Sequence, residues 1–132
     1  MTKQLLLSAL ALLSASLVAN AQCSAPNIGS APVTINASGS SVVITSTNGR
    51  SIHLCTLSVG FASPVSVTLQ ATTSGGAQNA LSGAYPLTSG NLILAVDFHG
   101  AVQTGVGNAF SINLSSAVAG GGIVTFYTTP YN

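Results

Sequence analysis

The chain has 132 residues and a formal net charge of +1, and only 2% of its residues are charged: Lys3, Arg50 and Asp97. Nucleic acid is excluded as a partner because phosphate binding needs clustered Lys and Arg, and the richness in Val, Ile and Leu argues against a disordered chain. A surface almost without charge also lacks the usual repulsion between copies, which favours self-association.

Residues 1–21 have the parts of a secretory signal peptide. Lys3 gives the positive start, Leu5–Val18 is apolar, and Ala19–Ala21 is a small-residue cleavage site. The alternative, a membrane anchor, is disfavoured because the apolar run is shorter than the ~20 residues that span a bilayer. We therefore predict one mature domain, residues 22–132, that is secreted or held at the cell surface and has no membrane segment.

The chain has 2 cysteines, Cys23 and Cys55. In an exported chain two cysteines predict one disulfide, with two unpaired thiols as the alternative. The bond would close a loop of about 32 residues and contribute roughly 3–4 kcal/mol on the chain-entropy model.

The mature chain alternates apolar and polar residues in short runs separated by Gly, Ser, Asn and Pro, which is typical of β-sandwiches and barrels. The predicted strands are Pro32–Asn36, Ser41–Thr47, Ser51–Phe61, Val65–Thr72, Leu81–Leu87, Asn91–Phe98, Ala109–Leu114 and Ile123–Thr129. We expect an all-β, single-domain sandwich or jelly-roll-like fold of about eight short strands.

The alternation also assigns faces. The side chains predicted to point inward are Val42, Ile44, Val65, Val67, Leu69, Ala71, Phe110, Ile112 and Leu114. Val33 and Ile35 share one face of their strand, and Leu92, Leu94, Val96 and Phe98 share one face of theirs, with Ile93, Ala95 and Asp97 on the other. Ser111 and Asn113 are predicted to point outward. Thr73–Asn79 and Gly100–Gly107 are predicted loops.

Ser51–Phe61 is predicted to be the longest strand. Asn48-Gly49 before it predicts a two-residue hairpin turn to the preceding strand. Its alternation places His53, Cys55, Leu57, Val59 and Phe61 on one face. The other face is apolar only in the first half, at Ile52 and Leu54. We expect that first half to be covered on both sides and the second half to be open to solvent on one side.

Enzymatic activity is not expected. Glycosidases need a pair of carboxylates, and the chain has one, Asp97. Asp97 and His99 share a face if their strand continues, and with His53 they could form a metal site or part of a triad. The favoured interpretation is a hydrogen-bonded, partly buried side chain for His53 and a solvated side chain at a strand end for His99, so no metal or cofactor is predicted. Arg50 is interpreted as a charge at a strand start or a partner for Asp97, with a ligand-binding cation as the alternative.

The surface offers candidate modification and contact residues. Asn36 and Asn113 lie in N-x-S sequons and predict a possible glycoprotein in a host with the machinery. Tyr85, Tyr127 and Tyr131 are candidates for stacking on sugar rings, with packing at the edge of the core as the favoured alternative.

The segments SIHLCTLSVGF, LSGAYPLTSG and GNAFSINLSSAVAGGGIVTFY resemble a group of small secreted or phage-encoded β-domain proteins. That group has a V-C strand, an L-T-G-A-Y-P-L segment, an N-A-L-C-I-N-L-S-x-A-V strand and a final G-x-V-T-Y strand. The resemblance supports export and a Cys23–Cys55 pairing. A second cysteine pair of the group is missing, since Ser111 stands at one of its positions. The group implies no activity.

Two functions follow as hypotheses. The first is a structural protein that self-associates into an extracellular filament, sheath or surface layer, with the extended segment Cys23–Ile35 adding to a neighbour's sheet edge. The second is a secreted or phage-associated module that binds cell-surface glycans through its loops, Thr73–Asn79 and Gly100–Gly107.

Overall fold

The structure is a computed structural model that describes residues 23–24 and 28–130. The predicted signal peptide and Tyr131 lie outside the described residues. Within the described ranges the chain forms nine strands and no helix that is long and apolar enough to cross a membrane. The strands are β1 Gly29–Ile35, β2 Gly39–Ile44, β3 Arg50–Phe61, β4 Val65–Thr72, β5 Gln78–Ala80, β6 Tyr85–Leu87, β7 Ile93–Gln103, β8 Ala109–Leu114 and β9 Gly120–Pro130.

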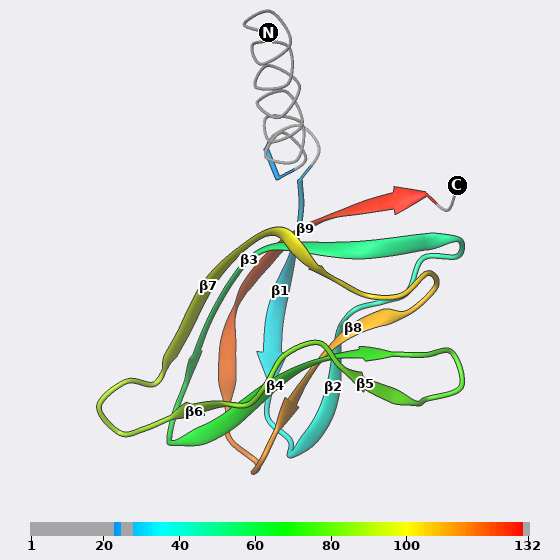
Figure 1. Cartoon of the computed structure of the whole chain (residues 1–132). Helices are drawn as coiled ribbons and strands as arrows, with labels where there is room; N and C mark the ends of the chain where they lie inside the picture. Colours follow the sequence, from blue (N-terminus) through cyan, green and yellow to red (C-terminus); the bar gives the residue numbers. More distant parts are fainter. Residues whose placement is uncertain (1–22, 25–27, 131–132) are drawn as a thin grey trace, which may run out of the picture.

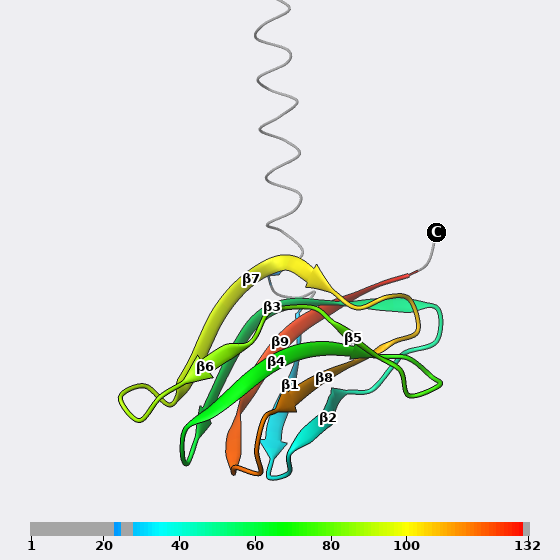
Figure 2. The same ribbon diagram turned by 60° about the horizontal axis from the view of Figure 1, so that its bottom comes forward.

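The strands form two antiparallel sheets that pack face to face (Figure 1). Sheet A has the order β1-β9-β3-β7, and sheet B has the order β2-β8-β4-β5 with β6 also paired to β4. Both sheets are strongly curved, as the turned view in Figure 2 shows. The predicted all-β, two-sheet sandwich is confirmed.

The core lies between the sheets and follows the predicted alternation on most strands. In β4 all the predicted inward residues are buried, and in β8 Phe110 and Ile112 have no exposed surface. On β7, Leu94 and Phe98 are buried, whereas Ile93, Ala95 and Asp97 point outward. Alternating side chains point to opposite faces of a strand, so each of these runs has one inner face.

The alternation of inward and outward side chains along the long strand β3 reverses at Cys55. The register of β3 against β9 shifts between Leu54 and Thr56, so Cys55 is an extra residue in the ladder, a β-bulge. Ile52 and Leu54 therefore share the core with Leu57, Val59 and Phe61. The prediction that His53 shares this face is wrong, because the bulge reverses the alternation.

The length, burial and disulfide expected for Ser51–Phe61 are confirmed. It corresponds to the longest strand of the described chain, with 12 residues in β3. Residues before the bulge are buried or half-buried on both sides, whereas Thr56 and Ser58 after it are exposed. Cys55 is disulfide-bonded to Cys23, as predicted. The bond ties the chain ahead of β1 to the centre of sheet A.

The Asn48-Gly49 hairpin prediction is wrong. A turn is present, since the Arg50 N–H donates to the Thr47 carbonyl at 3.1 Å and Gly49 has φ of 71°. However, β2 belongs to sheet B and β3 to sheet A, so the turn carries the chain from one sheet to the other. A local turn sequence specifies the reversal but not the strand that pairs next.

One predicted side-chain direction is also wrong. Val42 was expected inside but is 54% exposed, because β2 has a bulge between Val42 and Ile44. Ser111 lies opposite Val42 and Gln70 on the outer face of sheet B, as predicted, but it is fully buried there, and its hydroxyl lies 2.6 Å from that of Thr72. Ser111 is on a central strand of sheet B, where neighbouring side chains cover it.

Several predicted strand and loop boundaries differ from the structure. The predicted loop Thr73–Asn79 contains the start of β5, and the predicted strand Leu81–Leu87 is reduced to β6. Pro86 limits β6 to pairing on the sheet edge. The predicted loop Gly100–Gly107 is strand as far as Gln103, because β7 resumes its pairing with β3 after an interruption at His99 and Gly100.

Candidate functional site: the outer face of sheet A

The outer face of sheet A is an ordered array of mostly small side chains with two exposed isoleucines, Ile93 and Ile123. The register places outward residues in three cross-strand rows, each running β1, β9, β3, β7. The rows are Ser30, Thr125, Thr56 and Asp97; Pro32, Ile123, Ser58 and Ala95; and Thr34, Gly121, Gly60 and Ile93. Thr125 and Gly60 are partly exposed and the others are exposed.

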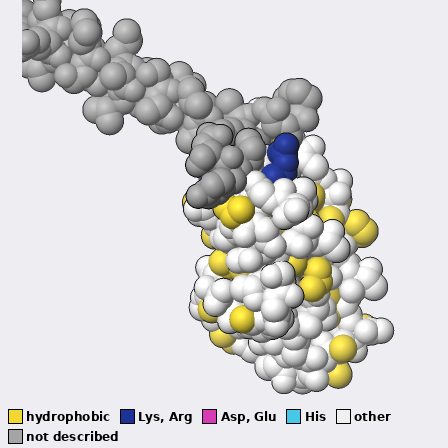
Figure 3. All heavy atoms as spheres, turned by 90° about the vertical axis from the view of Figure 1, so that its right-hand side faces the viewer, with side chains coloured by type: hydrophobic (Ala, Val, Ile, Leu, Met, Phe, Trp, Pro, Cys, Tyr) yellow, Lys and Arg dark blue, Asp and Glu magenta, His cyan; other side chains and the backbone are white. Residues whose placement is uncertain are grey.

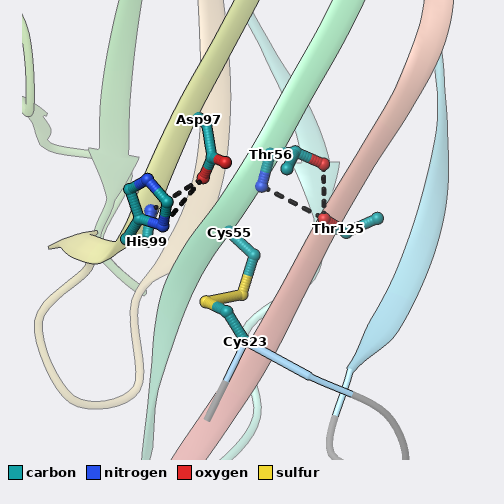
Figure 4. Close-up of polar contacts among 6 residues, drawn as sticks. All are labelled: Cys23, Cys55, Thr56, Asp97, His99 and Thr125. Carbon is teal, nitrogen blue, oxygen red and sulfur yellow. Dashed lines mark hydrogen bonds and ion pairs between the residues drawn. A yellow bond between two sulfur atoms is a disulfide. The ribbon is translucent and has the colours of Figure 1, made fainter. Parts of the chain in front are cut away.

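The first row is polar and internally bonded (Figure 4). The Thr125 hydroxyl accepts from the Thr56 N–H at 3.1 Å, and the two threonine hydroxyls are 2.5 Å apart. Such cross-strand Thr–Thr pairs stabilise a sheet by about 0.2–1 kcal/mol. The row therefore offers little unsatisfied hydrogen-bonding capacity at its centre.

Asp97 and His99 lie together at the end of this row. The His99 N–H donates to Asp97 Oδ1 at 3.1 Å, and the His99 ring Nδ1 is 3.5 Å from the same oxygen. Both side chains are more than half exposed. His99 has φ of 51°, a left-handed conformation that an Asx-type contact helps to hold. The pair is thus explained as a structural feature of the interruption in β7.

His53 makes its bonds elsewhere. Its ring stacks on Tyr127 with centroids 4.6 Å apart. Its Nδ1 is 3.3 Å from the Gly100 carbonyl and its Nε2 is 2.9 Å from the Thr129 hydroxyl. A carbonyl only accepts, so Nδ1 carries a proton and donates. The prediction of a hydrogen-bonded, partly buried His53 is confirmed. Within the described residues no group of His, Cys, Asp and Glu is placed to hold a metal ion.

The Tyr127 phenol is buried against His53 and Gly100. Burial raises the pKa of the Tyr127 phenol above its ordinary value, because desolvation disfavours the charged form. Tyr127 is therefore closed to stacking on a sugar ring. Tyr85 is half-buried beside the core.

Arg50 does not pair with Asp97 in the described structure. Its guanidinium Nη1 donates to the Thr128 hydroxyl at 3.3 Å, and the side chain is exposed. The interpretation of Arg50 as a charge at the start of a strand is consistent with this position.

The two sequons lie in different settings. Asn36 is exposed in the turn between β1 and β2, whereas Asn113 is half-buried within β8 and pairs with Ser40 and Thr68 on either side. A modifying enzyme has better access to Asn36.

Sequence reasoning identified the outward residues of several strands but not the array that they form. The rows depend on which strands are neighbours and on their register, and both are set by long-range packing. Ile93 and Ile123 are a weak sequence signal for this array, because each is an apolar residue on a face that is otherwise polar or small.

No protein-family model matches the chain, and no curated protein matches it. Among solved structures, the chain is similar to the nucleoplasmin-like N-terminal domain of Drosophila FKBP39. The two share 8% sequence identity with a TM-score of 0.45, and the match covers 83% of this chain and 97% of that chain.

Proposed function

We propose that the mature chain is an exported, non-enzymatic structural protein that self-associates into an extracellular filament, sheath or surface layer. The observation that carries the proposal is the lack of charge on the folded surface. Among the described residues the Lys, Arg, Asp and Glu side chains are Arg50 and Asp97. On the face in Figure 3 the surface is mainly uncharged, with scattered apolar side chains and one basic group.

A surface of this kind favours contact between copies. Net charge keeps ordinary proteins apart in solution, and a value near zero promotes association. Exposed hydroxyl and small apolar groups can be brought together without removing charges from water, which would carry a large desolvation penalty.

Export is part of the proposal. The Cys23–Cys55 disulfide is consistent with an oxidising compartment outside the cytosol. The signal-peptide pattern of residues 1–21 adds independent support from sequence.

The test uses protein recovered from the culture medium of the expressing cell. Negative-stain microscopy and light scattering should show filaments, sheets or higher oligomers with the mass of the processed chain. Material that stays monomeric at high concentration would overturn the proposal, and retention in the cytosol would overturn its export part.

A further inference from the structure

We infer that two copies pack face to face through the outer face of sheet A, each contributing the same surface. The inference rests on the proposed self-association and specifies the surface that performs it. Three observations support this choice: the sheet edges are interrupted, the outer face of sheet B is occupied by its own polar contacts, and the outer face of sheet A combines apolar projections with open glycines.

The edges of both sheets carry features that oppose strand addition. β1, the edge of sheet A that the sequence suggested as a donor to a neighbour, already pairs with β9 of its own chain and contains Pro32. β2 has its bulge at Val42, and β6 contains Pro86. β7 is interrupted by left-handed residues at His99 and Gly100. Prolines, bulges and short edges are the devices that prevent edge-to-edge pairing.

The outer face of sheet B is rich in polar groups, several of which contact one another, whereas Gln70 Oε1 is buried without a hydrogen-bond partner among the described residues. The Thr72 hydroxyl is within hydrogen-bond distance of the Ser111 hydroxyl and of the Gln78 side-chain oxygen, at 2.6 and 2.9 Å. Gln70 and Asn113 add side-chain amides to the same face. A copy that covered these amides would have to satisfy their donors and acceptors, because a buried polar group without a partner is costly.

The outer face of sheet A has projecting apolar side chains next to glycines that carry no side chain. Ile93 is 59% exposed and Ile123 is 48% exposed, in adjacent rows. Beside them lie Gly60 and Gly121, which carry no side chain, although a Cβ at Gly60 would be 3.9 Å from Cγ1 of Ile93. A two-fold contact places the same patch on both copies. The isoleucines of one copy can then lie over the glycines of the other, with the small side chains of Ser58 and Ala95 in the same row as Ile123.

The charge of this face agrees with a second copy as its occupant, and its size limits the strength of the contact. Its one ionisable side chain, Asp97, is on the edge strand β7 and contacts His99 at the rim. Four strands about 4.8 Å apart and three rows about 6.8 Å apart give a patch on the order of 400 Å². This is below the ~800 Å² per partner of a standard stable complex. The pair contact is therefore weak, and it becomes effective at high concentration or when it is repeated in an assembly.

The experiment measures association of the mature protein by sedimentation velocity at concentrations up to about 0.5 mM. Ile123→Lys puts a charge at the same position on both copies and should weaken association at least about tenfold. Ile123→Thr keeps the β-branched shape and should give a smaller loss. Val42→Lys, on sheet B, is the matched control because Val42 is 54% exposed. It should associate like the wild type.

The outcomes separate this inference from the function on which it rests. If the wild type associates and both Ile123 variants associate as strongly as the wild type, the inferred contact surface is wrong and the proposed function stands. The same holds if Val42→Lys weakens association as much as Ile123→Lys does. If wild type is monomeric throughout, the proposed function fails and the inference fails with it. Thermal unfolding by circular dichroism confirms that each variant compared is folded.

Discussion

Gly100 allows the Tyr127 phenol to approach the backbone of β7 beneath the His53 ring. An added Cβ at Gly100 would lie 2.8 Å from the Tyr127 hydroxyl oxygen, and the residue has φ of 82°. A side chain at this position would therefore combine left-handed strain with a steric conflict. The stack of His53 on Tyr127 is a packing feature that joins β3, β7 and β9.

Gly100→Ala should lower the free energy of unfolding by about 2–4 kcal/mol, measured by urea denaturation at low protein concentration. Gly107→Ala is the control, because Gly107 has φ of 73° but open space at its Cβ position. It should show the strain alone, about 1–2 kcal/mol. Equal effects for the two variants would contradict the contact with Tyr127.

Tyr127 also predicts a pH dependence at the alkaline end. The folded chain raises the pKa of the Tyr127 phenol, so it holds this proton more strongly than the unfolded chain does. The contribution to stability is complete below the ordinary value of 10.0 and is lost as pH rises from there through the folded pKa. The free energy of unfolding of Tyr127→Phe should fall less than that of the wild type as the pH rises through this range. Tyr85→Phe, which leaves Tyr127 in place, should decline like the wild type.

At the scale of elements, β3 holds the sandwich together. It pairs with β7 on one side and β9 on the other, and its bulge brings Cys55 to the disulfide with Cys23. The bond joins residues 32 positions apart in the chain. It therefore restrains the segment that leads into the edge strand β1.

Replacing both cysteines, as Cys23→Ser with Cys55→Ala, should lower the free energy of unfolding by about 3–4 kcal/mol, because the unfolded chain gains loop entropy. Chemical denaturation of the oxidised wild type and the double variant measures the difference. A loss below about 1 kcal/mol would show that β1 is held by its pairing with β9 alone.

The two faces of sheet A should respond differently to truncation. Leu54 has no exposed surface and lies in the core, so Leu54→Ala should cost about 2–5 kcal/mol. Ile93 points outward, and Ile93→Ala should change stability by less than about 0.5 kcal/mol. A large loss of monomer stability from Ile93→Ala would remove this residue from consideration as a free contact surface.

The alternation of apolar and polar residues predicts side-chain directions correctly where a strand has no bulge. Val65–Thr72 was predicted with the bounds that β4 has, and its inward residues are buried. It failed at Val42 and His53, because one extra residue in a ladder reverses every later side chain. The Asn48-Gly49 turn was recognised, but its role was not, since a turn joining two sheets has the same local sequence as a hairpin. The burial of Ser111 could be predicted only with knowledge of its neighbours on sheet B.

At the scale of the whole molecule, the fold presents an almost uncharged surface with interrupted edges and one face of small residues. These properties can be predicted in part from composition, because charge content is a property of the sequence. The choice of face depends on strand order and register, which the sequence alone does not specify.

The most direct measurement is sedimentation velocity of the mature protein over a series of concentrations, at about 50 and about 500 mM NaCl. We predict that the weight-average sedimentation coefficient rises with concentration. The rise should persist at the higher salt, because Arg50 and Asp97 are the chain's charged side chains beyond the predicted signal peptide. A constant monomer value across the series would contradict self-association. A rise that disappears at high salt would contradict an uncharged contact surface.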